Sequence, residues 1–246
     1  MINTTVKTLS AMSKHRIPRY VYHLTNKSNY ERIIQSGELK CSISDVFVPE
    51  AVFLADLVNF FKRWKFKPAG SKISSLQEKL LYQVQKDEGD LVMLRIPTAK
   101  LDSEKLFLRN PNRCFDLCDK YQEKFDEYAD EILAKYGGEF KPENEKAMFS
   151  DLREILKEFL SGEKDIDHIF EGVPAKFSKL FKQRKEPIEY LYRENISTEN
   201  IEKIGEVNID KLKASPQYDP QKRIRSIFTA LLKGTSEIKG AELLNC

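Results

Sequence analysis

The residue types best suited to chemistry first appear near the N-terminus, as a histidine and a threonine close together. His23 and Thr25 follow the run Tyr20–Tyr22, whose β-branched and aromatic side chains predict a short strand. The end of a strand beside the start of a helix presents side chains and free backbone N–H groups to a ligand. From its position alone, His23 is either a ligand-binding residue or a structural histidine whose hydrogen bonds are satisfied within the protein.

The helix expected after this strand is marked at both ends. Ser28 and Glu31 have the spacing of a capping box, in which two side chains bond to free backbone N–H groups around the first turn. Gly37 stands where a left-handed C-terminal cap is expected. These signals predict that His23 and Thr25 sit at the end of the strand, just before the helix begins.

Aromatic and acidic side chains recur beside two further predicted strands. Residues 51–64 predict a strand over 52–54 that leads into a helix carrying Phe61 and Trp64. Residues 185–196 predict a strand that carries Glu189. A carboxylate in such a place can stabilise a developing positive charge or act as a general base. Taken alone, Glu189 is equally a solvent-facing strand residue, and Trp64 a core aromatic.

Together these segments resemble the ADP-ribosyltransferase fold. The run Tyr22-His23-Leu24-Thr25, followed by a short helix and Gly37-Glu38-Leu39, is similar to the opening of that fold. Residues 51–64 are similar to the segment that forms the aromatic wall of the nicotinamide pocket in poly-ADP-ribose polymerases. Residues 185–196 look like the strand that carries the catalytic glutamate in DarT-like enzymes. The three motifs follow the family's order of histidine, aromatic and glutamate.

The resemblance implies an α+β fold, an ADP-ribosyltransferase-like split β-sandwich with flanking helices, and NAD as co-substrate. In such a site His23 binds the adenosine ribose, and the residues beside it hold the nicotinamide. Phe53 and Trp64 fall where the polymerases have two tyrosines, and Phe61 aligns with their nicotinamide-binding serine. Glu189 takes the catalytic role. The implied NAD-binding residues are His23, Leu24, Thr25, Phe53, Phe61 and Trp64.

The implied function is an NAD-dependent mono-ADP-ribosyltransferase of toxin or effector type, which modifies a nucleic acid or a protein and releases nicotinamide. Pro187 stands two residues before Glu189, where arginine-modifying relatives carry Gln or Glu, so arginine is not the expected acceptor. An antitoxin or another inhibitor would be a further partner. Two alternatives stay open: a degenerate fold that serves as a binding or scaffold module, and an RNA 2′-phosphotransferase-like enzyme.

The charge of the chain is unevenly distributed. The net charge is +3, but residues 113–167 hold 16 acidic and 9 basic residues, a net charge of −7. The rest of the chain is therefore basic, which favours a nucleic-acid partner, unless these charges are only solvated helix faces. A basic stretch with interleaved aromatics at 170–185 predicts either a nucleic-acid contact or an amphipathic helix.

The rest of the chain fits one domain of 246 residues, of which 41% are hydrophobic and 32% charged. A strand over 90–96 with an apolar run is expected to be buried on both faces. Helices over 113–136 and 143–160 predict a helical hairpin inserted at 110–168. A helix at 74–86, a last strand at 201–209 and a basic helical tail at 216–246 complete the prediction.

The cysteines and the hydropathy of the chain indicate the cellular compartment in which the protein is expected. Its four cysteines have no metal-ligand spacing, so no metal site is expected and reduced thiols are the simple interpretation. No apolar run approaches the roughly 18 residues that span a bilayer, and the N-terminus lacks an export signal. A cytoplasmic protein is expected, with delivery into another cell by a non-Sec secretion system as a second possibility.

Overall fold

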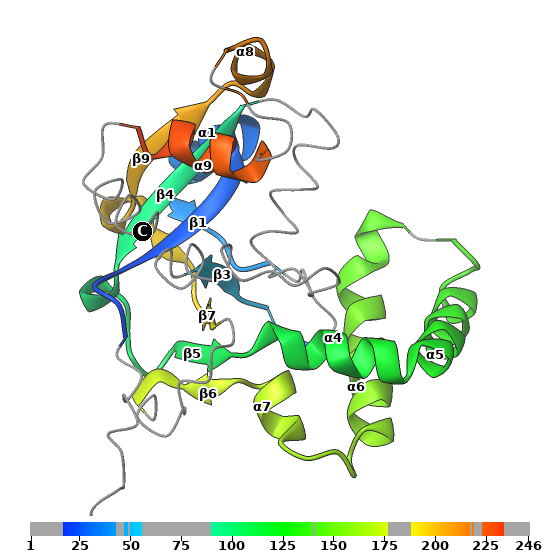
Figure 1. The fold of residues 1–246 in the computed structure, drawn as a ribbon. Coiled ribbons are helices and arrows are strands. Elements are labelled where there is room, and N and C mark those ends of the chain that lie inside the picture. The colour runs from blue at the N-terminus through cyan, green and yellow to red at the C-terminus, as the bar shows by residue number, and fades with distance from the viewer. Residues whose placement is uncertain are drawn as a thin grey trace, which may run out of the picture.

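The computed structural model describes residues 17–42, 47–48, 50–55, 90–139, 141–176, 188–216, 218 and 223–233. These residues form antiparallel strands and helices, which confirms the predicted α+β class (Figure 1). The helices predicted at 56–64 and 74–86, and most of the basic stretch at 170–185, lie outside the described residues. No helix within the described ranges is long and apolar enough to cross a membrane.

The elements follow the chain in this order. The strands are β1 (Tyr20–Asn26), β2 (Glu38–Leu39), β3 (Val52–Ala55), β4 (Leu91–Pro97), β5 (Leu106–Arg109), β6 (Val173–Pro174), β7 (Glu189–Tyr192), β8 (Ile196–Ser197) and β9 (Glu202–Val207). The α-helices are α1 (Lys27–Ser36), α4 (Pro111–Lys120), α5 (Gln122–Lys135), α6 (Glu145–Phe159), α7 (Ile166–Phe170), α8 (Ile209–Lys213) and α9 (Arg223–Leu231). Short 3-10 helices are η1 (Thr98–Lys100), η2 (Pro142–Asn144) and η4 (Thr198–Asn200).

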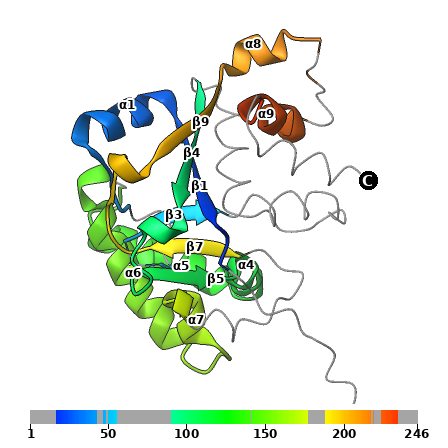
Figure 2. The same cartoon turned by 90° about the vertical axis from the view of Figure 1, so that its left-hand side faces the viewer.

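The described strands form a seven-stranded sheet in the order β6-β5-β7-β3-β1-β4-β9, with β2 and β8 paired separately. β1 pairs with β4 along its whole length, whereas its register with β3 holds one pair of described residues, Tyr22 with Ala55. The strands β1, β4 and β9 run in a clearly different direction from β5 and β7 (Figure 2). In the described residues, the expected split sandwich is thus one sheet whose halves turn away from each other between β1 and β3.

A single row of directly paired residues crosses this junction. It consists of Arg109, Glu189, Ala55, Tyr22, Arg95 and Glu202, on β5, β7, β3, β1, β4 and β9 in turn. Directly paired residues place their side chains on the same face of a sheet. An arginine and a glutamate are therefore neighbours at each end of the row, on one face.

The first strand and helix differ from the prediction in two respects. β1 continues through Asn26, so His23 and Thr25 lie within the strand and not at its end. The helix cap is Asn26, whose side-chain oxygen accepts from the backbone N–H of Asn29 at 2.8 Å. Ser28 was predicted to cap the helix, but its hydroxyl instead donates to the side-chain oxygen of Asn26. The C-terminal cap is confirmed, because Gly37 has φ 76°, a left-handed conformation.

Alternate residues of the strands pack into different layers. Leu54 and Tyr190 belong to a cluster with Ile33 of α1, while Phe53 and Leu191 belong to a cluster with α4, α6 and α7. On β4, Leu94 joins the first of these layers and Met93 packs with α9, and both are fully buried. The prediction that this strand is buried on both faces is confirmed.

Where a hairpin of two helices was predicted at 110–168, the described residues form four helices, α4 to α7, the last of which continues to Phe170. They lie beside the half of the sheet that contains β5 and β7 (Figure 1). The helix predicted over 113–136 is broken at Tyr121, whose φ is −125°. Its hydroxyl donates to Glu163 after α6, and its ring lies edge-on to Phe159 at 5.1 Å. These contacts turn Tyr121 toward α6, and the periodicity of the apolar residues does not reveal such a bend.

The last helix packs closely on the edge of the sheet at a glycine. Ile227 and Leu231 of α9 are buried in the cluster that contains Met93 and Val207. A Cβ atom on Gly205 of β9 would lie 1.7 Å from the carbonyl oxygen of Leu231. The absence of a side chain at this position therefore lets the backbones of α9 and β9 approach each other.

We predict that Gly205→Ala displaces α9 and lowers the free energy of unfolding by about 2 kcal/mol or more, as overpacking does. Gly162→Ala is the matched control, because nothing lies within 4 Å of its Cβ position. Its effect should stay within about 0.5 kcal/mol. Urea unfolding measures both. Equal midpoints for the two variants would contradict the close packing of α9 against β9.

Candidate active site

Glu189 and Arg109 form an ion pair inside the protein. Glu189 begins β7 and is 4% exposed, while Arg109 ends β5 and is 2% exposed. The Arg109 guanidinium donates to Glu189 from Nη2 at 2.6 Å and from Nε at 3.1 Å. Both bonds end on the same carboxylate oxygen, Oε2. The pair therefore fixes the direction of the Glu189 carboxylate.

The sequence of β5 explains how an arginine reaches this place. Leu106 and Leu108 pack into the layer shared with α1, so Phe107 and Arg109 point to the opposite face. The strand ends there because Pro111 begins α4, a position that proline favours. Arg109 pairs directly with Glu189 in the register between β5 and β7.

Two further groups surround the Arg109 guanidinium. Nη1 donates to the Cys114 sulfur, 3.5 Å away on α4. The guanidinium carbon lies 5.8 Å from the centre of the Phe53 ring, a cation–π distance. Moving two charges out of water costs several kcal/mol per ion, which close mutual attraction and added hydrogen bonds offset. The pair, the sulfur and the ring thus form one buried polar centre at the contact between sheet and helices.

His23 lies where β1 and β3 separate. Its Nδ1 is 3.0 Å from the backbone carbonyl oxygen of Phe53. A carbonyl oxygen only accepts, so Nδ1 carries the proton and donates. This bond joins the two strands just beyond their pair Tyr22 with Ala55, and it fixes the orientation of the imidazole.

His23 and Glu189 belong to opposite faces of the sheet by register. Tyr22 shares the row of Glu189, and His23 is the next residue along β1, so its side chain starts from the other face. Its partner on β4, Leu94, packs in the layer with α1. The structure therefore brings the strands of the two residues together, with the side chains on different sides of the β1–β3 junction.

The other predicted site residues divide into two groups. Leu24, Thr25 and Phe53 are 5%, 8% and 7% exposed and lie on β1 and β3. Leu24 packs with Tyr22 and α9, and Phe53 with the helical layer. Phe61 and Trp64 lie outside the described residues. In the described residues the site therefore consists of adjacent strands with mostly buried side chains.

The ion pair between Arg109 and Glu189 is not among the features predicted from the sequence. One pattern in the sequence points to Arg109. It stands two residues after Phe107 at the end of an apolar strand, so the two side chains share a face and Arg109 is expected to point inward. The row that Arg95 and Tyr22 share with Glu189 was not predicted either. The pairing register between strands distant in the chain carries that information, and a single sequence does not show it.

Cys41 is unsuited to act as a nucleophile at neutral pH. Burial raises the pKa of its thiol to about 11, and the charge of Glu50 adds to the rise. The thiolate is the reactive form of cysteine, so this group is almost wholly protonated near pH 7.

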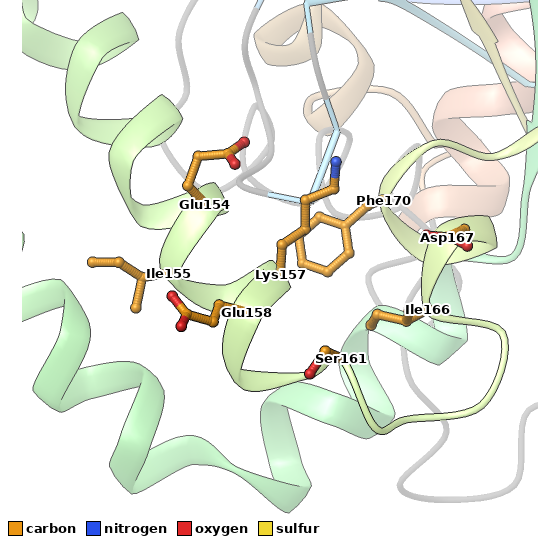
Figure 3. Close-up of a pocket in the computed structure, with 8 residues that line it drawn as sticks. All are labelled: Glu154, Ile155, Lys157, Glu158, Ser161, Ile166, Asp167 and Phe170. Carbon is orange, nitrogen blue, oxygen red and sulfur yellow. The ribbon is translucent and has the colours of Figure 1, made fainter.

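A cavity of about 600 Å³ lies between α6 and α7, and none of its lining residues belongs to the predicted site (Figure 3). Lys157 crosses it beside the ring of Phe170 and bonds to Glu171 at 2.9 Å. Burial alone would raise the pKa of Glu171, but the hydrogen bond from Lys157 and the charge of Arg193 lower it. Lys157 is thus held in an ion pair at the edge of this cavity.

In comparisons with known proteins, no family model, curated protein or solved structure matches the chain.

We predict that Arg109→Met lowers the free energy of unfolding by about 3–5 kcal/mol, because it leaves the Glu189 charge buried without its partner. The double variant Arg109→Met/Glu189→Leu should recover much of that loss, since it removes both charges. The control is Lys146→Met, whose pair with Glu50 is 73% and 46% exposed and should contribute about 1 kcal/mol or less.

Urea unfolding of five proteins measures these differences: the original protein, Arg109→Met, Glu189→Leu, the double variant and Lys146→Met. Additive effects of Arg109→Met and Glu189→Leu, or an Arg109→Met variant as stable as Lys146→Met, would contradict a coupled buried pair.

Proposed function

We propose that this protein is an NAD-dependent mono-ADP-ribosyltransferase of toxin or effector type. The observation that carries the proposal is the order β7-β3-β1 within the sheet. These three strands bear Glu189, Phe53 and His23, the residues of the glutamate, aromatic and histidine motifs. Strands from distant parts of the chain are thus neighbours, as one shared NAD site requires.

The proposed reaction breaks the bond between nicotinamide and ribose. Its transition state has oxocarbenium character, with positive charge developing at the anomeric carbon of the ribose. A fixed carboxylate stabilises such a charge without reorganising during the reaction. Glu189 supplies this carboxylate on the proposal, and the two bonds from Arg109 keep it oriented.

The side chains near the junction of β1 and β3 are of types that bind the parts of NAD. His23 offers an imidazole whose orientation is fixed through Nδ1, which suits contact with the adenosine ribose. Phe53 offers an aromatic ring on the strand between His23 and Glu189, which suits the nicotinamide. Leu24 and Thr25 follow His23 on the edge of β1 that turns away from β3, and they would flank the nicotinamide. Phe61 and Trp64 are proposed to complete the aromatic wall.

The acceptor on this proposal is a nucleic acid or a protein. The net positive charge of the chain outside residues 113–167 favours a nucleic acid. A toxin of this kind acts in a cytoplasm, either its own or that of a cell into which it is delivered. An antitoxin or another inhibitor would then restrain it in the producing cell.

A second candidate is a binding or scaffold module of the same fold that transfers nothing. The observation that favours it is the burial of Glu189, 4% exposed and ion-paired with Arg109, which is typical of a structural pair. A catalytic carboxylate has to reach the ribose, whereas a structural one does not. Binding and transfer assays separate the two functions.

We predict that Glu189→Gln lowers transfer of ADP-ribose at least about 100-fold, as loss of transition-state charge stabilisation does. The amide keeps an oxygen that can accept from Arg109, so most NAD affinity should remain. His23→Ala should weaken NAD binding about tenfold, by the loss of one hydrogen bond. Glu199→Gln is the matched control, because it makes the same change at an exposed position on η4.

The measurement uses NAD labelled on the adenylate phosphate, a cell lysate, and separate nuclease and protease digestion. Label removed by nuclease identifies a nucleic-acid acceptor, and label removed by protease identifies a protein acceptor. Urea unfolding of each variant shows that it is folded. Equal transfer by Glu189→Gln and the original protein would end the mechanism, and absence of NAD binding would favour the scaffold module.

A further inference from the structure

The cavity between α6 and α7 has a lining that combines carboxylates with apolar side chains (Figure 3). Glu154, Glu158 and Ser161 are spaced at i, i+4 and i+7, so they follow one face of α6 and of the turn after it. All three are exposed, whereas Leu156 is buried in the cluster shared with α4 and α7. The core of the protein therefore does not cover this face of α6.

The two walls of the cavity are tied to each other. Ile166 and Asp167 line it from α7. Lys157 of α6 donates at 2.9 Å to Glu171, the residue that follows α7. Glu171 also accepts from Nη2 of Arg193 at 3.0 Å, just after β7. These bonds hold α7 beside α6, so the cavity is formed before a ligand arrives.

The lining of the cavity carries an excess of negative charge. It holds three carboxylates, those of Glu154, Glu158 and Asp167, and one ammonium group, that of Lys157, so its net charge is −2. Among the described residues, Lys157 is paired with a carboxylate outside the lining, and none of the three lining carboxylates has an ion-pair partner. The surrounding segment 113–167, with a net charge of −7, extends the negative field. The cavity therefore favours a cation and repels a nucleic acid.

The apolar part of the lining indicates which kind of cation fits. Ile155 and Ile166 line the cavity together with the carboxylates (Figure 3). Long cationic side chains pack their apolar stems along such surfaces while the charged head stays near water and carboxylates. The arginine fork also matches the geometry of carboxylate oxygens. A volume of about 600 Å³ is within the range of pockets that hold drug-sized ligands, so it suits a peptide segment better than a small ion.

We propose that the cavity between α6 and α7 is a docking site for a basic segment of a partner protein, which inserts an arginine between the two helices. The inserted guanidinium bonds to the lining carboxylates, and its stem packs against Ile155 and Ile166. None of the lining residues belongs to the proposed NAD site. The inference therefore holds whether or not the protein transfers ADP-ribose.

The test measures binding of a fluorescein-labelled peptide of six arginines by fluorescence anisotropy. The salt concentration is 0.15 M, at which exposed charges more than about 8 Å apart are largely screened. A labelled peptide of six glutamines tests whether charge is needed. The first variant removes the three lining carboxylates: Glu154→Gln/Glu158→Gln/Asp167→Asn. The matched control removes three carboxylates from exposed positions on α5 and η2, outside the lining: Glu123→Gln/Asp130→Asn/Glu143→Gln.

A second variant, Ser161→Trp, tests the cavity itself. It places a large ring in the lining and leaves every charge in place. Its control is Gly162→Trp, which adds the same ring one residue further, outside the lining, where nothing lies within 4 Å of a Cβ atom. Urea unfolding shows that each variant is folded.

The proposal predicts that the cavity triple variant and Ser161→Trp each bind the arginine peptide at least about tenfold more weakly, because exposed ion pairs are lost or blocked. Both controls should stay within about twofold of the original protein. Equal affinity of the cavity triple variant and its control would refute the docking site, as would equally tight binding of the glutamine peptide. Self-association in sedimentation that Ser161→Trp abolishes would instead assign the cavity to a second copy of this protein.

Discussion

The buried ion pair between Arg109 and Glu189 constrains the structure around it. Two charges stay out of water only where neighbouring groups exclude solvent and satisfy their bonds, and here β3, β5 and α4 do so. Phe53 and Cys114 complete the surround from β3 and α4. The pair therefore connects β5 and β7 of the sheet to α4. Both the sheet and this helix must be folded for the two buried charges to be stabilised.

The proposed NAD site lies at the junction of β1 and β3. β1 and β4 pair along the whole length of β1, whereas the described residues of β1 and β3 share one register pair, Tyr22 with Ala55. Beyond that pair, Nδ1 of His23 donates a hydrogen bond to the backbone carbonyl oxygen of Phe53. The row of paired residues from Arg109 to Glu202 crosses this junction on the face of the sheet that carries Glu189.

Much of the fold could be predicted from local pattern. The apolar run of β4 indicated a strand buried on both faces, and Gly37 indicated the end of α1, because each depends on residues close in the chain. The cap at Asn26 and the bend at Tyr121 were missed, since each depends on a competing contact, to Asn29 and to Glu163. Glu189 and His23 stay predicted site residues. The ion pair of Glu189 with Arg109, and the opposite faces of Glu189 and His23, follow from strand register, which a single sequence does not show.

The most direct test of the central claim is a histidine side-chain nuclear magnetic resonance spectrum recorded during addition of NAD. The chain has three histidines, so few signals need assignment. The account predicts that the ring signals of His23 shift and saturate with NAD, while those of His168 on α7 stay unchanged. Saturating NAD that leaves the His23 signals unmoved would contradict an NAD site at the β1–β3 junction.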